Sequence, residues 1–169
     1  MDDRSFREKS GSKNRFAHWG EEQERWMLGQ VANHSGFAWI MNGSQIFPSM
    51  PFKESLSKEH KENLKGTMSD LSQLATKVAF VSGDVHYSEI SKIEKERLGY
   101  TTFEFTSSGL HSPNFPGAPD IIPNWRRIAS TGRRNYVLID SYFTGKCLYL
   151  DMRSRGLRGQ THFSRTLSI

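Results

Sequence analysis

The sequence predicts an α/β fold built as one domain. An apolar run at 37–41, a helical pattern over 57–74 and a β-favouring run at 78–81 follow each other as strand, helix and strand. This order indicates adjacent, parallel, buried strands. Further β patterns occur at 100–106 and over 136–150. The chain has 169 residues, 36% of them hydrophobic, which suits one buried core better than two domains.

The first expected element is a helix over residues 20–33. Three glutamates occupy its first turn, where negative charge is favourable, and a turn signal beginning at Asn33 ends it. We expect Trp26, Met27 and Val31 to face the core. The run at 37–41 that follows is short and bounded by turn signals, as in a buried strand.

The second expected helix spans residues 57–74. Its apolar residues Leu64, Met68, Leu71 and Leu74 recur at helical spacing, and most of the others are charged or small. The strand at 78–81 follows directly.

The C-terminal half is expected to be mainly β. Residues 100–106 alternate apolar and polar side chains, and the runs at 136–139 and 147–150 indicate a hairpin that turns near Gly145. The Pro- and Gly-rich segment 113–123 between them predicts a long surface loop.

Composition limits the classes of partner. The net charge is +5, and residues 121–169 carry nine basic residues against two acidic ones. No aromatic-interleaved RNA signature accompanies these arginines, so a solvated surface is favoured over a nucleic-acid interface. No apolar run is long enough to span a membrane, and residues 1–4 do not open a signal segment. The single cysteine, Cys147, lies in an apolar stretch and is expected to be buried.

A candidate metal-binding pair follows the strand at 78–81. Asp84 and His86 are two residues apart, so an extended backbone would point both side chains to one side, and Gly83 would let the chain turn close to an ion. A carboxylate with an imidazole suits iron, manganese or zinc. Taken alone, such a pair is more often a capping Asp and a surface His.

Two other strand ends support a site. Residues 42–45 and 106–111 are rich in small polar side chains, which let backbone N–H groups face an anion. Each segment alone also fits ordinary turn chemistry. Loops at the carboxyl ends of parallel strands converge, so together they predict a ligand site, and His111 is a candidate to approach the substrate there.

Several segments resemble the alkaline phosphatase D-like metallophosphoesterases. Their similarity runs in family order from residue 2 to about residue 150. The matching segments are Asp2-Asp3-Arg4 through Arg7, Gly20-Glu21-Glu22-Gln23 with Trp26, Asn42-Gly43-Ser44-Gln45-Ile46, Val81 through Ile90, and Phe103 through Leu110.

This resemblance implies the fold and the chemistry. The family has a two-layered β-sandwich flanked by helices (α/β/β/α), of which residues 1–169 would form the C-terminal half, a partial metallophosphoesterase domain apparently truncated at its N-terminus. It implies two metal ions, typically iron and calcium, and hydrolysis of phosphate monoesters or diesters by a metal-bound hydroxide. Family members are often exported, but the sequence leaves the localisation open.

The resemblance also implies roles for individual residues. It implies Asp84 and His86 as catalytic metal ligands and Glu54 as an acidic residue near the metals. It implies substrate-side or supporting roles for Arg4, Asn42 and Gln45, beside the His111 candidate described above.

Other metal motifs of the family, which lie before the Asp-x-Arg segment, have no counterpart in this sequence. Two interpretations follow. In the first, the chain belongs to a phosphatase that needs the absent N-terminal half for metal binding and activity. In the second, it is a non-catalytic remnant that binds an N-terminal half or a second chain through an exposed sheet edge.

Overall fold

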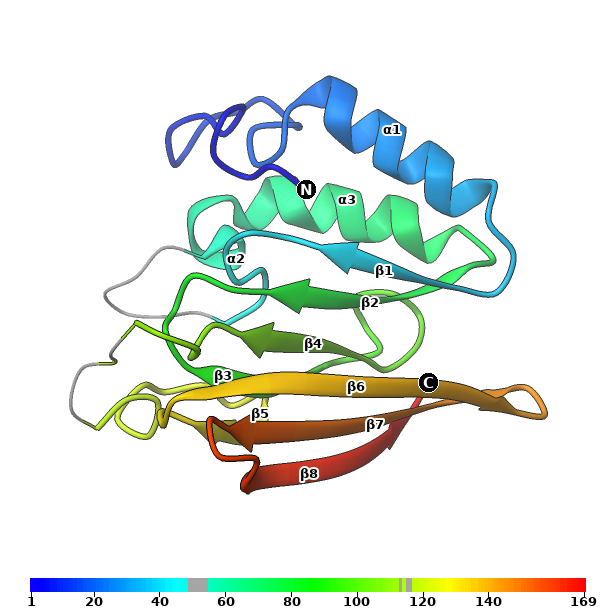
Figure 1. The fold of residues 1–169 in the computed structure, drawn as a ribbon. Coiled ribbons are helices and arrows are strands. Elements are labelled where there is room, and N and C mark those ends of the chain that lie inside the picture. The colour runs from blue at the N-terminus through cyan, green and yellow to red at the C-terminus, as the bar shows by residue number, and fades with distance from the viewer. Residues whose placement is uncertain (49–54, 113, 115–116) are drawn as a thin grey trace.

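A computed structural model describes residues 1–169 except 49–54, 113 and 115–116. The described chain forms three layers, with helices on one face of a five-stranded sheet and a three-stranded sheet on the other face (Figure 1). This confirms the predicted α/β fold with sheets flanked by helices. No helix in the described part of the chain is long and apolar enough to cross a membrane.

The first helix and strand match their predicted ranges. Helix α1 spans Glu21–Ala32 and strand β1 spans Phe37–Met41. Met27 and Val31 are buried as expected, whereas Trp26 is 61% exposed, so the prediction that it faces the core is wrong. Each helical residue turns by about 100°, which places Trp26 well away from the stripe that Met27 and Val31 share.

The predicted helix over 57–74 is divided into two. Helix α2 spans Leu56–Glu59 and helix α3 spans Lys61–Ser72. The break is at His60, whose backbone leaves the helical region (φ −130°, ψ 41°) while its side chain is almost fully buried. The predicted core residues Leu64, Met68 and Leu71 do face inward from α3.

The larger sheet has the strand order β1-β2-β4-β3-β5. Strands β1, β2 and β4 are parallel, which confirms the βαβ prediction, and β3 runs antiparallel to both of its neighbours. Strands β3 and β5 were not expected from the sequence. The bounds are β2 Lys77–Ser82, β3 Ser88–Ile93, β4 Thr102–Ser107 and β5 Arg127–Thr131.

The smaller sheet is an antiparallel meander. The predicted hairpin is present as β6 (Asn135–Thr144) and β7 (Cys147–Gly156), each much longer than expected, and β8 (Thr161–Ser168) adds an unexpected third strand. The hairpin turns at Gly145, whose φ is 61°. Cys147 is exposed rather than buried, because it is the first residue after this turn.

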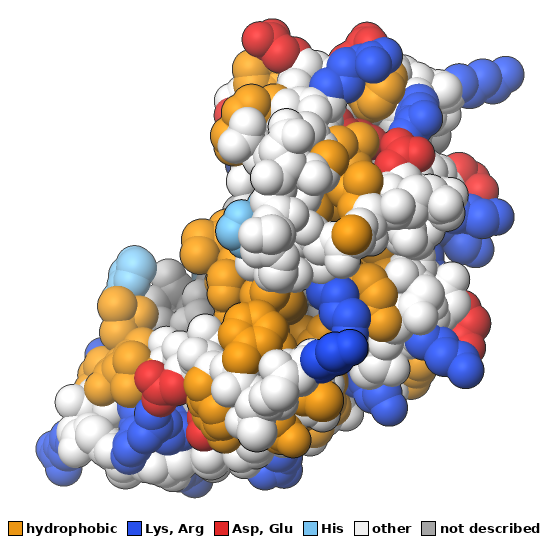
Figure 2. Space-filling model, turned by 90° about the vertical axis from the view of Figure 1, so that its right-hand side faces the viewer, with side chains coloured by type: hydrophobic (Ala, Val, Ile, Leu, Met, Phe, Trp, Pro, Cys, Tyr) orange, Lys and Arg blue, Asp and Glu red, His pale blue; other side chains and the backbone are white. Residues whose placement is uncertain are grey.

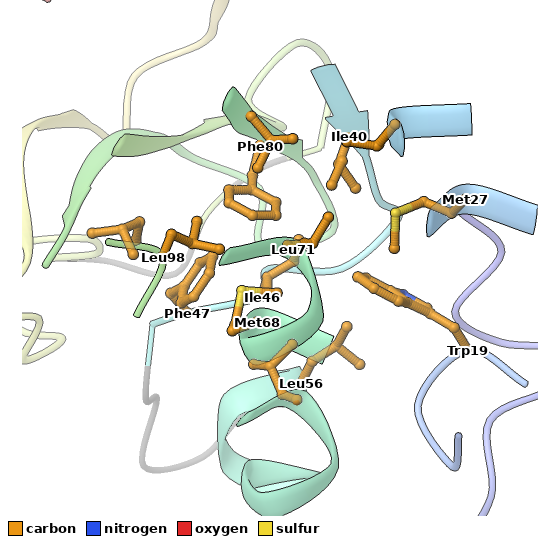
Figure 3. Packing of buried hydrophobic residues seen from close by; sticks show 14 residues of the cluster. Trp19, Met27, Ile40, Ile46, Phe47, Leu56, Met68, Leu71, Phe80 and Leu98 are labelled. Carbon is orange, nitrogen blue, oxygen red and sulfur yellow. The ribbon is translucent and has the colours of Figure 1, made fainter. Parts of the chain in front are cut away.

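Two hydrophobic clusters hold the layers together. One joins the helices to the larger sheet, and Figure 3 shows side chains from several elements, including Trp19, Met27 and Phe80, gathered into it. The other lies between the sheets, where Phe105 of β4 belongs to the same buried cluster as Leu150 of β7. In β2, Phe80 belongs to the first cluster and its neighbour Ala79 to the second, so alternate residues of this strand serve different layers, as the pleat requires.

Candidate functional site

The carboxyl ends of the three parallel strands meet at one end of the larger sheet (Figure 1). The N–H of Asn42 donates to the carbonyl of Val81 (2.8 Å), and the N–H of Gly83 donates to the carbonyl of Gly43 (3.0 Å). A Cβ at Gly83 would lie 3.2 Å from that carbonyl oxygen, so a larger residue would push the two loops apart. The strand ends that the sequence predicts to converge do so.

The loop after β2 holds Asp84 and His86 in an unusual backbone conformation. Their φ angles are 72° and 65°, in the left-handed region, so the expected extended backbone is wrong. Non-glycine residues are uncommon there and often occur at functional sites. Both side chains are exposed. Two such residues in one tight loop mark it as a feature that the surrounding structure enforces.

Arg4 lies beside this loop. Its guanidinium Nη2 is 3.1 Å from Oδ1 of Asp84, and the two side chains are 61% and 39% exposed. An ion pair this exposed adds little to folding stability. The ion pair matters for its position, because it brings Arg4, predicted to face the substrate, into contact with Asp84, predicted to bind a metal.

Asn42 is the centre of a buried hub that fixes the end of β1. Its side-chain Oδ1 accepts from the indole N–H of Trp19 (2.8 Å), and its Nδ2 donates to Asp3 (2.9 Å) and to the carbonyl of Ser44 (2.7 Å). The N–H of Ser44 also donates to Asp3 (2.8 Å). All hydrogen-bonding atoms of the Asn42 amide are used, so this residue holds the loop.

A second buried polar group lies beneath the strand ends. The side-chain Nε2 of Gln45 donates to Glu89 (3.1 Å) and to the hydroxyl of Thr106 (2.9 Å). Glu89 also pairs with Arg127 at 2.6 Å and accepts from the amide of Asn124 at 2.8 Å. Gln45 and Glu89 are fully buried. The network therefore links the end of β1 to β3, β4 and β5.

Glu104 of β4 is a fully buried carboxyl in the same region. Its two oxygens accept from the backbone N–H groups of Ile46 (2.7 Å) and Phe47 (2.9 Å). Burial raises the pKa of Glu104 to about 7, although these two hydrogen bonds favour the ionised form. Burial likewise raises the pKa of the Tyr87 hydroxyl well above its usual value.

The described residues do not make a complete metal site. No group of three or more His, Cys, Asp or Glu side chains within the described ranges is placed to hold an ion. Asp84 and His86 are a pair, and Asp84 already contacts Arg4. Glu54, the third expected ligand, lies outside the described residues. The donor set on hand therefore does not by itself fit the two-metal centre that the resemblance implies.

The other predicted residues fall into two groups. Arg4 lies at the loop surface, whereas Gln45 is fully buried and Asn42 is 8% exposed. His111 is exposed after β4, and within the described part of the chain no hydrogen bond joins it to the other candidates.

Sequence reasoning missed Asp3, Glu89, Glu104 and Arg127. Of these four, only Glu104 could have been noticed in the sequence, because it is a carboxylate in the middle of an apolar strand pattern. The partners of the other three come from segments that are distant in the sequence.

Fold and strand ends together define a mixed α/β sandwich with a polar edge where parallel strands converge. A solved structure of PhoD shares this fold, with a TM-score of 0.57, 17% sequence identity, and coverage of 95% of this chain and 34% of that chain. This chain therefore has a PhoD-like fold and spans about a third of the PhoD chain. No protein-family model matches the sequence, and no curated protein does.

Proposed function

We propose that this chain contributes to a metal-dependent phosphoester hydrolase of the alkaline phosphatase D-like type, acting on phosphate monoesters or diesters. The observation that carries the proposal is the loop after β2, where Asp84 and His86 have left-handed backbones beside Arg4, at the converging ends of parallel strands. The PhoD-like fold supports the proposal, because it agrees with the family resemblance that implies Asp84 and His86 as metal ligands.

The proposal assigns different tasks to the candidates. Asp84 and His86 supply a carboxylate and an imidazole for metal coordination, and Arg4 supplies a positive charge for a phosphate oxygen. Asn42 and Gln45 position the loop through the buried contacts described above. Residues 1–169 act as the C-terminal part of such a domain, and the remaining ligands come from Glu54 and from a part of the enzyme outside this chain.

The test begins with the purified 169-residue chain. Its metal content is measured after incubation with iron, manganese, calcium or zinc, and hydrolysis is assayed with p-nitrophenyl phosphate and bis-p-nitrophenyl phosphate. Because further ligands lie outside this chain, we expect only weak metal retention, which falls in Asp84→Asn and His86→Gln but not in the exposed control Asp120→Asn. Turnover lost in the same two variants would strengthen the assignment. Wild-type metal content in both variants would refute it.

A second candidate is a non-catalytic interaction module. An apolar groove of about 520 Å³ runs along β1 beside α1 and includes the exposed side chains of Trp26 and Met41. Figure 2 shows hydrophobic side chains in a hollow between the helical part at the top and the strands at the bottom. Exposed apolar surface of this kind often marks a protein contact.

The edge of β1 is already partly protected. The N–H of Asn42 points to β2, so alternation directs the main chain of Phe37 and Met41 away from the sheet. The carbonyl of Phe37 lies 3.1 Å from Nε2 of His34, and that of Met41 accepts from the amino group of Met1. This protection opposes the addition of a strand at the edge. We therefore assign a second copy of the chain as the partner, with the apolar grooves of the two copies in contact.

Sedimentation velocity over a concentration series tests this candidate. A dimer that dissociates in the double variant Trp26→Ser/Met41→Ser, and not in the exposed control Leu157→Ser, would support it. A monomer at every concentration would exclude it.

A further inference from the structure

A basic pocket lies at the start of β6 and the turn between β7 and β8. It has a volume of about 320 Å³, and its lining contains three arginines and one histidine but no acidic residue. The lining residues are Arg133, Arg134, Leu157, Arg158, Gln160 and His162.

The three arginines of this pocket have no carboxylate partner among the described residues. Other arginines differ, since Arg127 pairs with the buried Glu89 and Arg126 pairs with Glu94 at 2.7 Å. Gathering like charges without a counter-charge is unfavourable for folding. An anion bound in this pocket would supply the missing counter-charge to the three exposed guanidinium groups.

The backbone of the pocket is fixed on both sides. The carbonyl of Arg133 accepts from the amide of Asn135 (2.8 Å), and the carbonyl of Arg134 lies 3.3 Å from Nε2 of His162. Across the pocket, the N–H of Arg158 donates to Oε1 of Gln160 (3.1 Å). The backbone that carries the three arginine side chains is therefore held in place.

Gly156 provides the space for this arrangement. A Cβ there would lie 2.3 Å from Nε2 of Gln160 and 2.8 Å from Nε2 of His162. A side chain at this position would displace both of these pocket-lining residues. The pocket is thus a consequence of the end of β7 as well as of the arginines themselves.

The pocket lies at the same end of the molecule as the candidate site. The N–H of Asn135 donates to the carbonyl of Gly109 (2.9 Å), which joins the start of β6 to the segment that leaves β4. In Figure 1 the start of β6 and the β7–β8 turn lie on the left, as do the loops that follow β1, β2 and β4. The pocket and the candidate site therefore lie at the same end of the molecule.

We propose that this basic pocket is a phosphate-binding subsite for a ligand that carries more than one phosphate group. Guanidinium groups match phosphate oxygens with paired hydrogen bonds, and Arg133, Arg134 and Arg158 supply three such groups. As a subsite it rests on the proposed function, because the second phosphate would belong to the substrate of the Asp84 and His86 loop. As an anion site it stands on the pocket alone.

Calorimetric titration of the full chain with inorganic tripolyphosphate and with inorganic phosphate tests the proposal. We expect saturable binding of tripolyphosphate at 50 mM salt, at least tenfold tighter than inorganic phosphate. The double variant Arg133→Gln/Arg158→Gln should lower the tripolyphosphate affinity at least tenfold, because each lost charged hydrogen-bonding group removes a substantial part of the binding free energy. Circular dichroism verifies that the variants fold.

The matched control is Arg25→Gln/Arg165→Gln, which removes the same charge from exposed positions outside the pocket. It should change the affinity less than twofold. An equal loss in both double variants would show diffuse attraction and overturn the proposal, as would the lack of saturable binding by the wild type. Equal affinities for the two probes would overturn the claim of several phosphates.

This titration measures no hydrolysis. A chain that binds tripolyphosphate, but whose Asp84→Asn and His86→Gln variants keep the wild-type metal content, would leave the anion site standing and refute the ligand roles on which the proposed hydrolase function rests. Metal retention that depends on Asp84, without tripolyphosphate binding, would support the proposed hydrolase function and remove the phosphate subsite.

Discussion

Replacing Glu104 by glutamine should change how stability depends on pH. The carboxyl group is buried, with a pKa of about 7 in the folded chain against an ordinary value of 4.5. Between these values the folded state binds more protons than the unfolded state. Glu104 therefore contributes stability that is fully present below pH 4.5 and is lost as the pH rises through about 7.

The size of this effect follows from the two pKa values. Linkage gives a decrease of about 2.5 kcal/mol in the unfolding free energy between pH 5 and pH 8. Glutamine cannot titrate, so Glu104→Gln should lose this slope. It should also carry a pH-independent cost of about 1–3 kcal/mol, because one amide oxygen must serve the N–H groups of Ile46 and Phe47.

Urea unfolding followed by tryptophan fluorescence at pH 5, 6, 7 and 8 provides the measurement. The difference in unfolding free energy between variant and wild type should shift by about 2.5 kcal/mol over this range in favour of the variant. Every other titrating group cancels in that difference. The exposed control Glu62→Gln should show no such shift. A constant difference for Glu104→Gln would refute the burial argument.

Three further outcomes are expected. His86→Val should be less stable than His86→Gly by about 1–2 kcal/mol in urea unfolding, because the backbone there has a φ of 65° and a β-branched residue tolerates it poorly; equal stabilities would contradict this. Asn42→Ala should cost about 2–3 kcal/mol, because it leaves buried groups of Asp3 and Trp19 without a partner, and a loss below about 0.5 kcal/mol in urea unfolding would show that the hub is not stabilising. Burial lowers the pKa of His18 to about 4, so the unfolded state binds more protons than the folded state between pH 6.5 and 4. The free energy of unfolding should therefore decrease as the pH is lowered through that window. Thermal melts of the wild type and His18→Gln check the last point, and an unchanged slope in the variant would count against it.

The parallel core was predictable because its sequence pattern is local. Strands at 37–41 and 78–81 are apolar runs next to clear turn signals, and the helix between them has regular apolar spacing. Because parallel strands must end at one edge, the convergence of residues 42–45 with the loop at Gly83 followed from the βαβ order.

Strand β3 could not be predicted in the same way. It carries Glu89, Ser91 and Lys92 within six residues, which is polar for a central strand. Two of these side chains are nevertheless fully buried, because Asn124 bonds both and Arg127 pairs with Glu89. Those partners come from more than thirty residues away, so local hydrophobicity gives no signal.

The convergence of the candidate segments was predictable, but their detailed geometry was not. The Asp84 and His86 pair was visible as a motif, whereas its left-handed backbone and the contact with Arg4 depend on how distant segments pack. The same holds for Asn42, which is a small polar residue in the sequence and a fully bonded hub in the structure.

The two sheets should form at different times during folding. In the β6–β8 meander each strand pairs with the next across a short turn, so its first contacts close small loops. In the larger sheet β1 pairs with β2 in the register Phe37 to Lys77, which closes a loop of about 40 residues. We expect an early species in which the meander is hydrogen-bonded while the parallel strands β1, β2 and β4 are not yet paired. The loops after β1, β2 and β4, which carry the candidate site, would then be the last to be brought together.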